Sequence, residues 1–142
     1  MDAIKQTVQD CVLGFRSAQD IQQQYDKVGW RMSEPEFRKF RHIAIHLSKY
    51  VGKLSEIAEQ WEHAVYDDGI GESGVVIASK AEDIASAVGS LIYHSAQLSS
   101  LAGLQMSVCF LDRLTANAIR FAPESVFTKL TEMASRDDSA GG

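Results

Sequence analysis

The sequence predicts an all-α protein, a bundle of four to five helices, and three observations support this prediction. Apolar residues recur at alternating spacings of three and four over most of the chain. Only two prolines occur among 142 residues, and each stands where a helix should begin. No run of period-two alternation is long enough for a strand. We therefore expect one bundle domain over residues 1–134 and a disordered tail over residues 135–142.

The first two predicted helices cover residues 2–26 and a long segment that begins near Ser33. Ser33 suits a helix N-cap, and Pro35 has the fixed φ that a first helical turn accepts. The apolar seam that follows keeps heptad spacing, and a second apolar line flanks it, which favours a multi-helix bundle over a two-stranded coiled coil. The seam consists of Phe37, Phe40, Ala44, Leu47, Val51, Leu54, Ala58, Trp61 and Val65, and the flanking line of Ile43, Tyr50, Ile57 and Ala64.

Glycines and Pro123 separate the remaining predicted helices. Three glycines among acidic residues between positions 67 and 74 stop the long helix and predict a loop. A helix over residues 76–101 is rich in alanine, glycine and serine, so a neighbouring helix could approach it closely. Gly103 ends this helix, a further helix covers residues 104–121, and Pro123 begins a short helix that reaches about residue 133.

The net charge of −5 conceals two oppositely charged stretches. Residues 31–53 hold six lysines and arginines against two glutamates, a net charge of +4. Residues 54–83 hold eight acids against one lysine, a net charge of −7. Because nucleic-acid binders gain affinity from clustered lysine and arginine that displace counterions, the overall acidity argues against a nucleic-acid partner.

We expect a cytoplasmic protein with no membrane segment. The first residues show no cationic region that leads into an apolar run, so no secretory signal is visible. No stretch approaches the roughly 18 uninterrupted apolar residues that a membrane span needs. Cys11 and Cys109 match no metal-ligand spacing and are expected to be reduced, packed thiols.

Two groups of residues could hold a metal ion. His42 and His46 lie four residues apart, on one face of a helix, but the glutamate of a zincin motif is absent, which favours surface histidines. The second group is a set of carboxylates that could hold Mg²⁺ through oxygen ligands, and the alternative is a solvated acidic face. These carboxylates belong to Glu56, Glu59, Glu62, Glu82 and Asp83.

Three segments resemble the MazG-like, all-α nucleotide pyrophosphohydrolases. The stretch HLSKYVGKLSEI at residues 46–57 looks like the family's first signature helix, and KAEDI at residues 80–84 stands where the family has glutamate, two residues and aspartate. RLTANAIRF at residues 113–121 is similar to the closing pattern of lysine, asparagine and arginine with an aromatic residue. The resemblance covers about residues 37–121. It implies hydrolysis of nucleoside triphosphates with Mg²⁺ and assembly as a homodimer or tetramer.

The acidic positions of this family are mostly occupied here by Lys49, Tyr50, Lys53 and Lys80, and only Asp83 remains. Protonated lysine cannot ligate Mg²⁺ and repels it. We therefore expect a bundle that has lost the metal site and binds a nucleotide-type anion or a protein partner. The residues expected to bind the anion are Lys49, Lys53, Lys80, Arg113, Asn117 and Arg120.

Two alternatives stay open. The first is an active Mg²⁺-dependent nucleoside triphosphate pyrophosphohydrolase with displaced ligands, and the second is a structural helical oligomer or adaptor. Oligomerisation is expected in every case, because the wide apolar face and the aromatic residues Trp30, Phe37 and Trp61 leave surface for another subunit. The displaced metal ligands would be Glu56, Glu59, Glu82 and Asp83.

Overall fold

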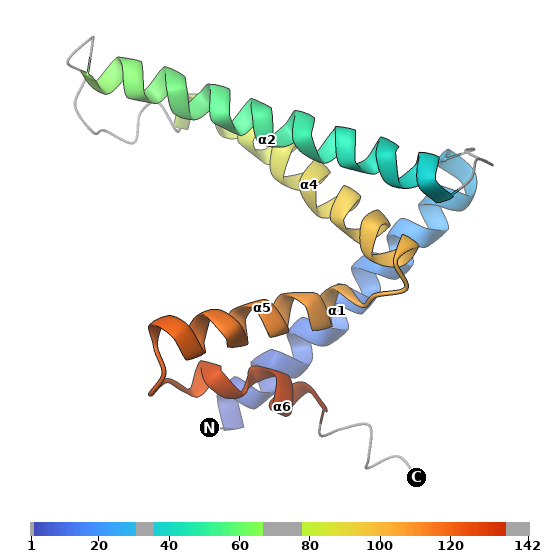
Figure 1. The fold of residues 1–142 in the computed structure, drawn as a ribbon, viewed down its shortest axis with the longest axis vertical. Helices are drawn as coiled ribbons and strands as arrows, with labels where there is room; N and C mark the ends of the chain where they lie inside the picture. The colour runs from blue at the N-terminus through green and yellow to red at the C-terminus, as the bar shows by residue number, and fades with distance from the viewer. Residues whose placement is uncertain (1, 31–35, 67–77, 136–142) are drawn as a thin grey trace. The chain divides into compact units, whose positions relative to one another are not determined.

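The computed structural model describes residues 2–30, 36–66 and 78–135, and over these residues it contains helices and no strand (Figure 1). The all-α prediction is therefore confirmed for this part of the chain, and a helical bundle fits it. The α-helices are α1 (Asp2–Gly29), α2 (Glu36–Tyr66), α4 (Ala81–Leu101), α5 (Met106–Phe121) and α6 (Leu130–Ser135), and the 3₁₀ helix is η1 (Val126–Lys129).

The helix ends follow the sequence pattern closely, but several starts do not. A turn at Lys80 interrupts the helix predicted over residues 76–101, α5 begins at Met106 rather than at residue 104, and the final helix begins at Val126 rather than at Pro123. Helix α1 extends three residues beyond its predicted end at residue 26, and α5 ends at Phe121, as predicted. The short final helix is divided into η1 and α6, and it reaches Ser135. The proposed N-cap Ser33, the glycine loop at 67–74, the predicted helix start at residue 76 and residues 136–142 lie outside the described residues.

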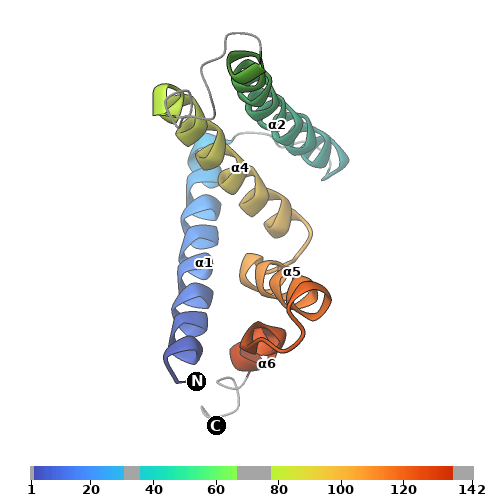
Figure 2. The same ribbon diagram turned by 90° about the vertical axis from the view of Figure 1, so that its left-hand side faces the viewer.

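The chain divides into two compact units, one formed by residues 1–31 and 99–142 and the other by residues 32–98. In the first unit, α1 packs against α5 and α6, which also pack against each other (Figure 2). Its core contains Val8 from α1, Leu111 from α5 and Leu130 from α6, which are all at least 95% buried. The discontinuous first unit is therefore held together by apolar residues from both ends of the chain.

The end of α4 is a Schellman motif centred on Gly103. The Gly103 amide donates to the Ser100 carbonyl over 3.2 Å, and the Leu104 amide donates to the Ser99 carbonyl over 2.8 Å. Gly103 has a φ of 68°, a left-handed conformation that side chains with a Cβ rarely adopt. This geometry confirms the prediction that Gly103 ends the helix.

A side chain from α1 caps the start of α5. The backbone amide of Met106 donates a 2.7 Å hydrogen bond to Oε1 of Gln19, and Nε2 of Gln19 donates to the Leu104 carbonyl over 3.1 Å. The residue before the helix, Gln105, makes no capping bond of its own. Gln19 is 92% buried, so it satisfies an amide at the start of α5 that has no acceptor within its own helix.

The second unit pairs α2 with α4, and their contact differs from the predicted seam. The buried residues of α2 are Ile43 and Ile57, which belong to the flanking line. In the heptad seam, Phe37 is 71% exposed, Phe40 50% and Val51 54%. The flanking line is therefore the more buried side of the apolar face, and Tyr50, one of its residues, stacks on His94 of α4.

Helix α4 buries small and polar residues together. Ala87 and Ala96 are almost completely buried, whereas a Cβ at the exposed Gly89 would meet no atom within 4 Å, so the expected close approach of a neighbour is absent at Gly89. His94 and Gln97 are also buried, although both are polar. Because buried polar groups must find hydrogen-bond partners, this pair indicates a polar network within the second unit.

Helices of the described part of the chain do not reach the length and apolar character that crossing a membrane requires. Neither cysteine is in a disulfide. Cys11 is half-buried, and burial raises the pKa of its thiol. Cys109 is exposed, so the prediction that both thiols are packed is wrong for Cys109.

Candidate functional site

Three histidines lie together in the second unit. Four residues separate His42 and His46 on α2, and their ring centroids are 4.4 Å apart. The ring of His94, from α4, lies 4.9 Å from that of His46. The histidine pair on α2 is therefore not isolated on the surface, because α4 adds a third imidazole to it.

His94 is oriented by its own helix. Its Nδ1 lies 2.8 Å from Oε1 of Gln97, and Nε2 of Gln97 donates to the hydroxyl of Tyr93 over 2.8 Å. Since the Gln97 oxygen can only accept, Nδ1 of His94 is the donor in this contact. This chain of hydrogen bonds fixes the ring that completes the group of three.

Two lysines border the same group. The Nζ atoms of Lys49 and Lys53 each lie 5.6 Å from the centroid of the Tyr50 ring, within the range of a cation–π contact. The Tyr50 ring in turn stacks on His94, with centroids 5.9 Å apart and planes inclined by 25°. We call the whole group the histidine–lysine cluster, and it consists of His42, His46, Lys49, Tyr50, Lys53 and His94.

The side chains of the cluster lie close enough together to change the pKa of His46. Burial lowers the pKa of His46, and the neighbouring His42, His94 and Lys49 lower it further. The Nδ1 atom of His46 is buried and has no hydrogen-bond partner among the described residues. A positive local potential and a desolvated ring therefore both disfavour a proton on His46.

The stability of the protein should decrease as the pH falls through the titration of His46. The pKa of His46 in the folded state lies below its ordinary value of 6.5, so the unfolded chain takes up the proton first. The neutral His46 ring therefore contributes stability above pH 6.5. This contribution is lost as the pH falls through the lower pKa of the folded state. Urea unfolding between about pH 8 and pH 5 should show this loss, and His46→Gln should reduce it.

His63→Gln is the matched control for this measurement, because His63 lies on the same helix and its side chain is 64% exposed. Its removal should leave the dependence on pH nearly unchanged. An equal slope in the wild type and in His46→Gln would contradict the prediction.

The predicted anion-binding residues are divided between the two units. Lys49 and Lys53 lie together around Tyr50, and Lys80 precedes α4 in the same unit. Arg113, Asn117 and Arg120 are exposed on α5 in the first unit. The Arg120 guanidinium lies 4.8 Å from the Phe121 ring. Of the six residues, the structure brings Lys49 and Lys53 into one group.

The predicted carboxylate ligands are exposed at two places in the second unit. Glu56 and Glu59 lie on α2, where Glu59 is 3.8 Å from Nε2 of His63. Glu82 and Asp83 occupy the first turn of α4. Within residues 2–30, 36–66 and 78–135, no three or more histidine, cysteine or acidic side chains are grouped as metal ligands would be.

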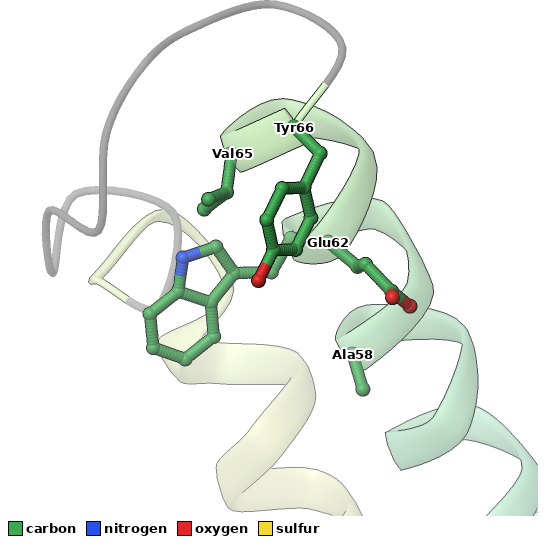
Figure 3. Close-up of a pocket in the computed structure, with 5 residues that line it drawn as sticks. Ala58, Glu62, Val65 and Tyr66 are labelled. Atoms are coloured by element: carbon green, nitrogen blue, oxygen red, sulfur yellow. The ribbon is translucent and has the colours of Figure 1, made fainter.

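Two features of the second unit were not predicted from the sequence. His94 carries no motif and lies far along the chain from His42 and His46, so only the pairing of α2 with α4 reveals it. The other is an open hollow of about 460 Å³ on the last turns of α2 (Figure 3). It is lined by Ala58, Trp61, Glu62, Val65 and Tyr66.

Comparison of the chain with protein-family models, with curated proteins and with solved structures found no match.

Proposed function

We propose that the protein binds a nucleotide-type anion at the histidine–lysine cluster and does not hydrolyse it. The observation that carries this proposal is the position of two ammonium groups, those of Lys49 and Lys53, at 5.6 Å from one aromatic ring. A phosphate group bound beside Tyr50 would meet both positive charges. Lysine suits this role because its ammonium is a compact point charge with three donors.

The histidines support the same proposal. Burial is the largest cause that lowers the pKa of His46, and a positive field from His42, His94 and Lys49 adds to it. That field attracts an anion, and a bound phosphate would in turn raise the pKa of His46, so binding should strengthen as the pH falls. The cluster thus couples anion binding to proton uptake.

Charge reversal at the two lysines tests the proposal directly. Lys49→Glu combined with Lys53→Glu should weaken binding of a nucleoside triphosphate at least tenfold, because each lost charge-assisted hydrogen bond costs about 1.5–3 kcal/mol. Isothermal titration calorimetry at fixed ionic strength measures the change. Lys27→Glu combined with Lys129→Glu changes the net charge equally at exposed positions of the first unit, and it should leave the affinity unchanged.

Other outcomes overturn the proposal in distinct ways. Equal loss in both double variants would mean that net charge alone attracts the anion. A loss caused by Arg113→Glu and Arg120→Glu instead would move the site to α5. Release of pyrophosphate from a nucleoside triphosphate with Mg²⁺ would favour the active hydrolase, and the acids Glu82 and Asp83 would then be the first ligands to replace.

We also propose a fold family and an oligomeric state for the protein. We propose that the chain is a MazG-like bundle whose metal ligands have been replaced, as the lysines at positions 49, 53 and 80 indicate. We also propose that it is a homo-oligomer. The exposed seam of α2, with Phe37, Phe40 and Val51 each at least half exposed, supports the second statement.

A further inference from the structure

We infer that the heptad seam of α2 pairs two copies of this chain in antiparallel orientation. The inference rests on the proposed homo-oligomer and specifies its interface. The seam runs along a helix of 31 residues, which is about 46 Å long at 1.5 Å per residue. Phe40 and Val51, two of its residues, are 50% and 54% exposed, so an apolar surface suited to another helix is open along α2.

The charges beside the seam indicate which helix binds there and in which orientation. Residues 36–53 of α2 hold five cations and one acid, whereas residues 54–66 hold three acids and no lysine or arginine. Two copies that run in the same direction would place like charges side by side. In antiparallel copies, the +4 half of one helix lies along the −3 half of the other. The complementary partner for this helix is therefore the helix itself.

Arg41 and Glu62 make this argument specific. Both occupy the heptad position directly beside the seam, on the edge opposite to the flanking line of Ile43 and Ile57, and both side chains are exposed. In the antiparallel pair, Arg41 of each copy faces Glu62 of the other. The two-fold symmetry gives this contact twice.

The sizes of the seam residues fit the same register. Each heptad has two seam positions. In an antiparallel pair, the first seam position on one helix lies opposite the second seam position on the other helix, and in each layer of this register a larger residue meets a smaller one. The small side chains of Ala44 and Ala58 then lie opposite Trp61 and Leu47. The layers are Phe40 with Val65, Ala44 with Trp61, Leu47 with Ala58, and Val51 with Leu54, each between the two copies.

The hollow at the end of α2 lies within this interface. Its lining residues Ala58, Trp61 and Val65 belong to the seam (Figure 3). In the stated register they face Leu47, Ala44 and Phe40 of the second copy. In this register the half-exposed Phe40 side chain of the second copy would enter the hollow.

The dimer leaves the histidine–lysine cluster open. On a helix with 3.6 residues per turn, the line of Ile43 and Ile57 separates the seam from His42, His46, Lys49 and Lys53. Binding of an anion and pairing of two copies thus use different sides of α2. A variant in the seam should keep anion affinity, and a variant in the cluster should keep the dimer.

Light scattering across a dilution series tests the pairing. The wild type should be a dimer at micromolar concentration, and Val51→Glu should be monomeric because it places two carboxylates near the centre of the apolar interface. Val28→Glu, at a position that is 72% exposed on α1, is the matched control and should stay dimeric. Phe40→Gln, with no charge, should weaken the dimer at least tenfold, and circular dichroism would verify that both seam variants remain helical.

A charge swap tests the orientation. Arg41→Glu and Glu62→Arg should each weaken the dimer by about two- to thirtyfold, since each breaks two symmetry-related ion pairs. The combined variant should restore wild-type affinity. Failure of this restoration would overturn the antiparallel arrangement.

The remaining outcomes separate the inference from the proposals on which it rests. A monomeric wild type would overturn both the homo-oligomer and the pairing. A dimer that is insensitive to Val51→Glu and Phe40→Gln would overturn the pairing alone. Calorimetry of Val51→Glu with a nucleoside triphosphate would give unchanged affinity if anion binding is independent of the dimer, and lost affinity would overturn the assignment of the two functions to separate faces.

Discussion

Replacing Ile43 with alanine should lower the free energy of unfolding by about 2–5 kcal/mol, the range measured for such truncations in protein cores. The side chain of Ile43 has no exposed surface, so its removal leaves a cavity as well as losing the transfer free energy of the missing methyl and methylene groups. Urea unfolding followed by circular dichroism gives the change. It is the largest effect that we expect from one apolar truncation in the second unit.

Ile45→Ala is the matched control, because it removes the same atoms from the same helix two residues away. Ile45 is 55% exposed, and its loss should cost less than about 1 kcal/mol. Similar costs for the two variants would mean that Ile43 is not the buried position of α2. A larger cost for Ile45 would place the core of the hairpin on the other side of the helix.

Replacing Gln19 with leucine should lower the free energy of unfolding by about 1–3 kcal/mol, because the buried amide of Met106 would lose its acceptor. The Leu104 carbonyl would lose its donor in the same variant. Gln19→Glu keeps an oxygen for the Met106 amide and removes the donor, so it should cost less than Gln19→Leu. Unfolding in urea measures both.

Gln24→Leu provides the control, since Gln24 is an exposed glutamine on the same helix. Its replacement should change stability by no more than about 0.5 kcal/mol. If Gln19→Leu were as harmless as Gln24→Leu, the bond to Met106 would not contribute to the stability of the first unit.

The helices could be predicted from the sequence because their signals are local. The end of α4 is an example: Gly103 alone has the conformational freedom that the observed left-handed turn needs, and the turn depends only on residues 99–104. The end of α5 at Phe121 is equally local, because Pro123 follows it. Neither depends on which helix lies nearby.

The side of α2 that is buried could not be predicted in the same way. Heptad spacing identifies an apolar face but does not show how much of that face a neighbour covers. Ile43 and Val51 are both apolar and only eight residues apart, yet one is fully buried and the other is 54% exposed. That difference depends on where α4 packs, which is a long-range property.

The candidate site was predictable only in part for the same reason. Lys49 and Lys53 are one helical turn apart, so their proximity follows from the sequence. The third histidine, His94, and the buried Gln19 each join segments far apart along the chain. No local pattern distinguishes His94 from an exposed histidine.

The discontinuity of the first unit has a consequence for the order of folding during synthesis. Gln19 and Met106 are 87 residues apart along the chain. The second unit, residues 32–98, is continuous and lies between these two residues in the sequence. Helix α1 leaves the ribosome first but must wait for α5 and α6 before its apolar face is covered. We therefore expect the hairpin of α2 and α4 to form on the nascent chain while α1 is still unpaired, with closure of the first unit as the last step.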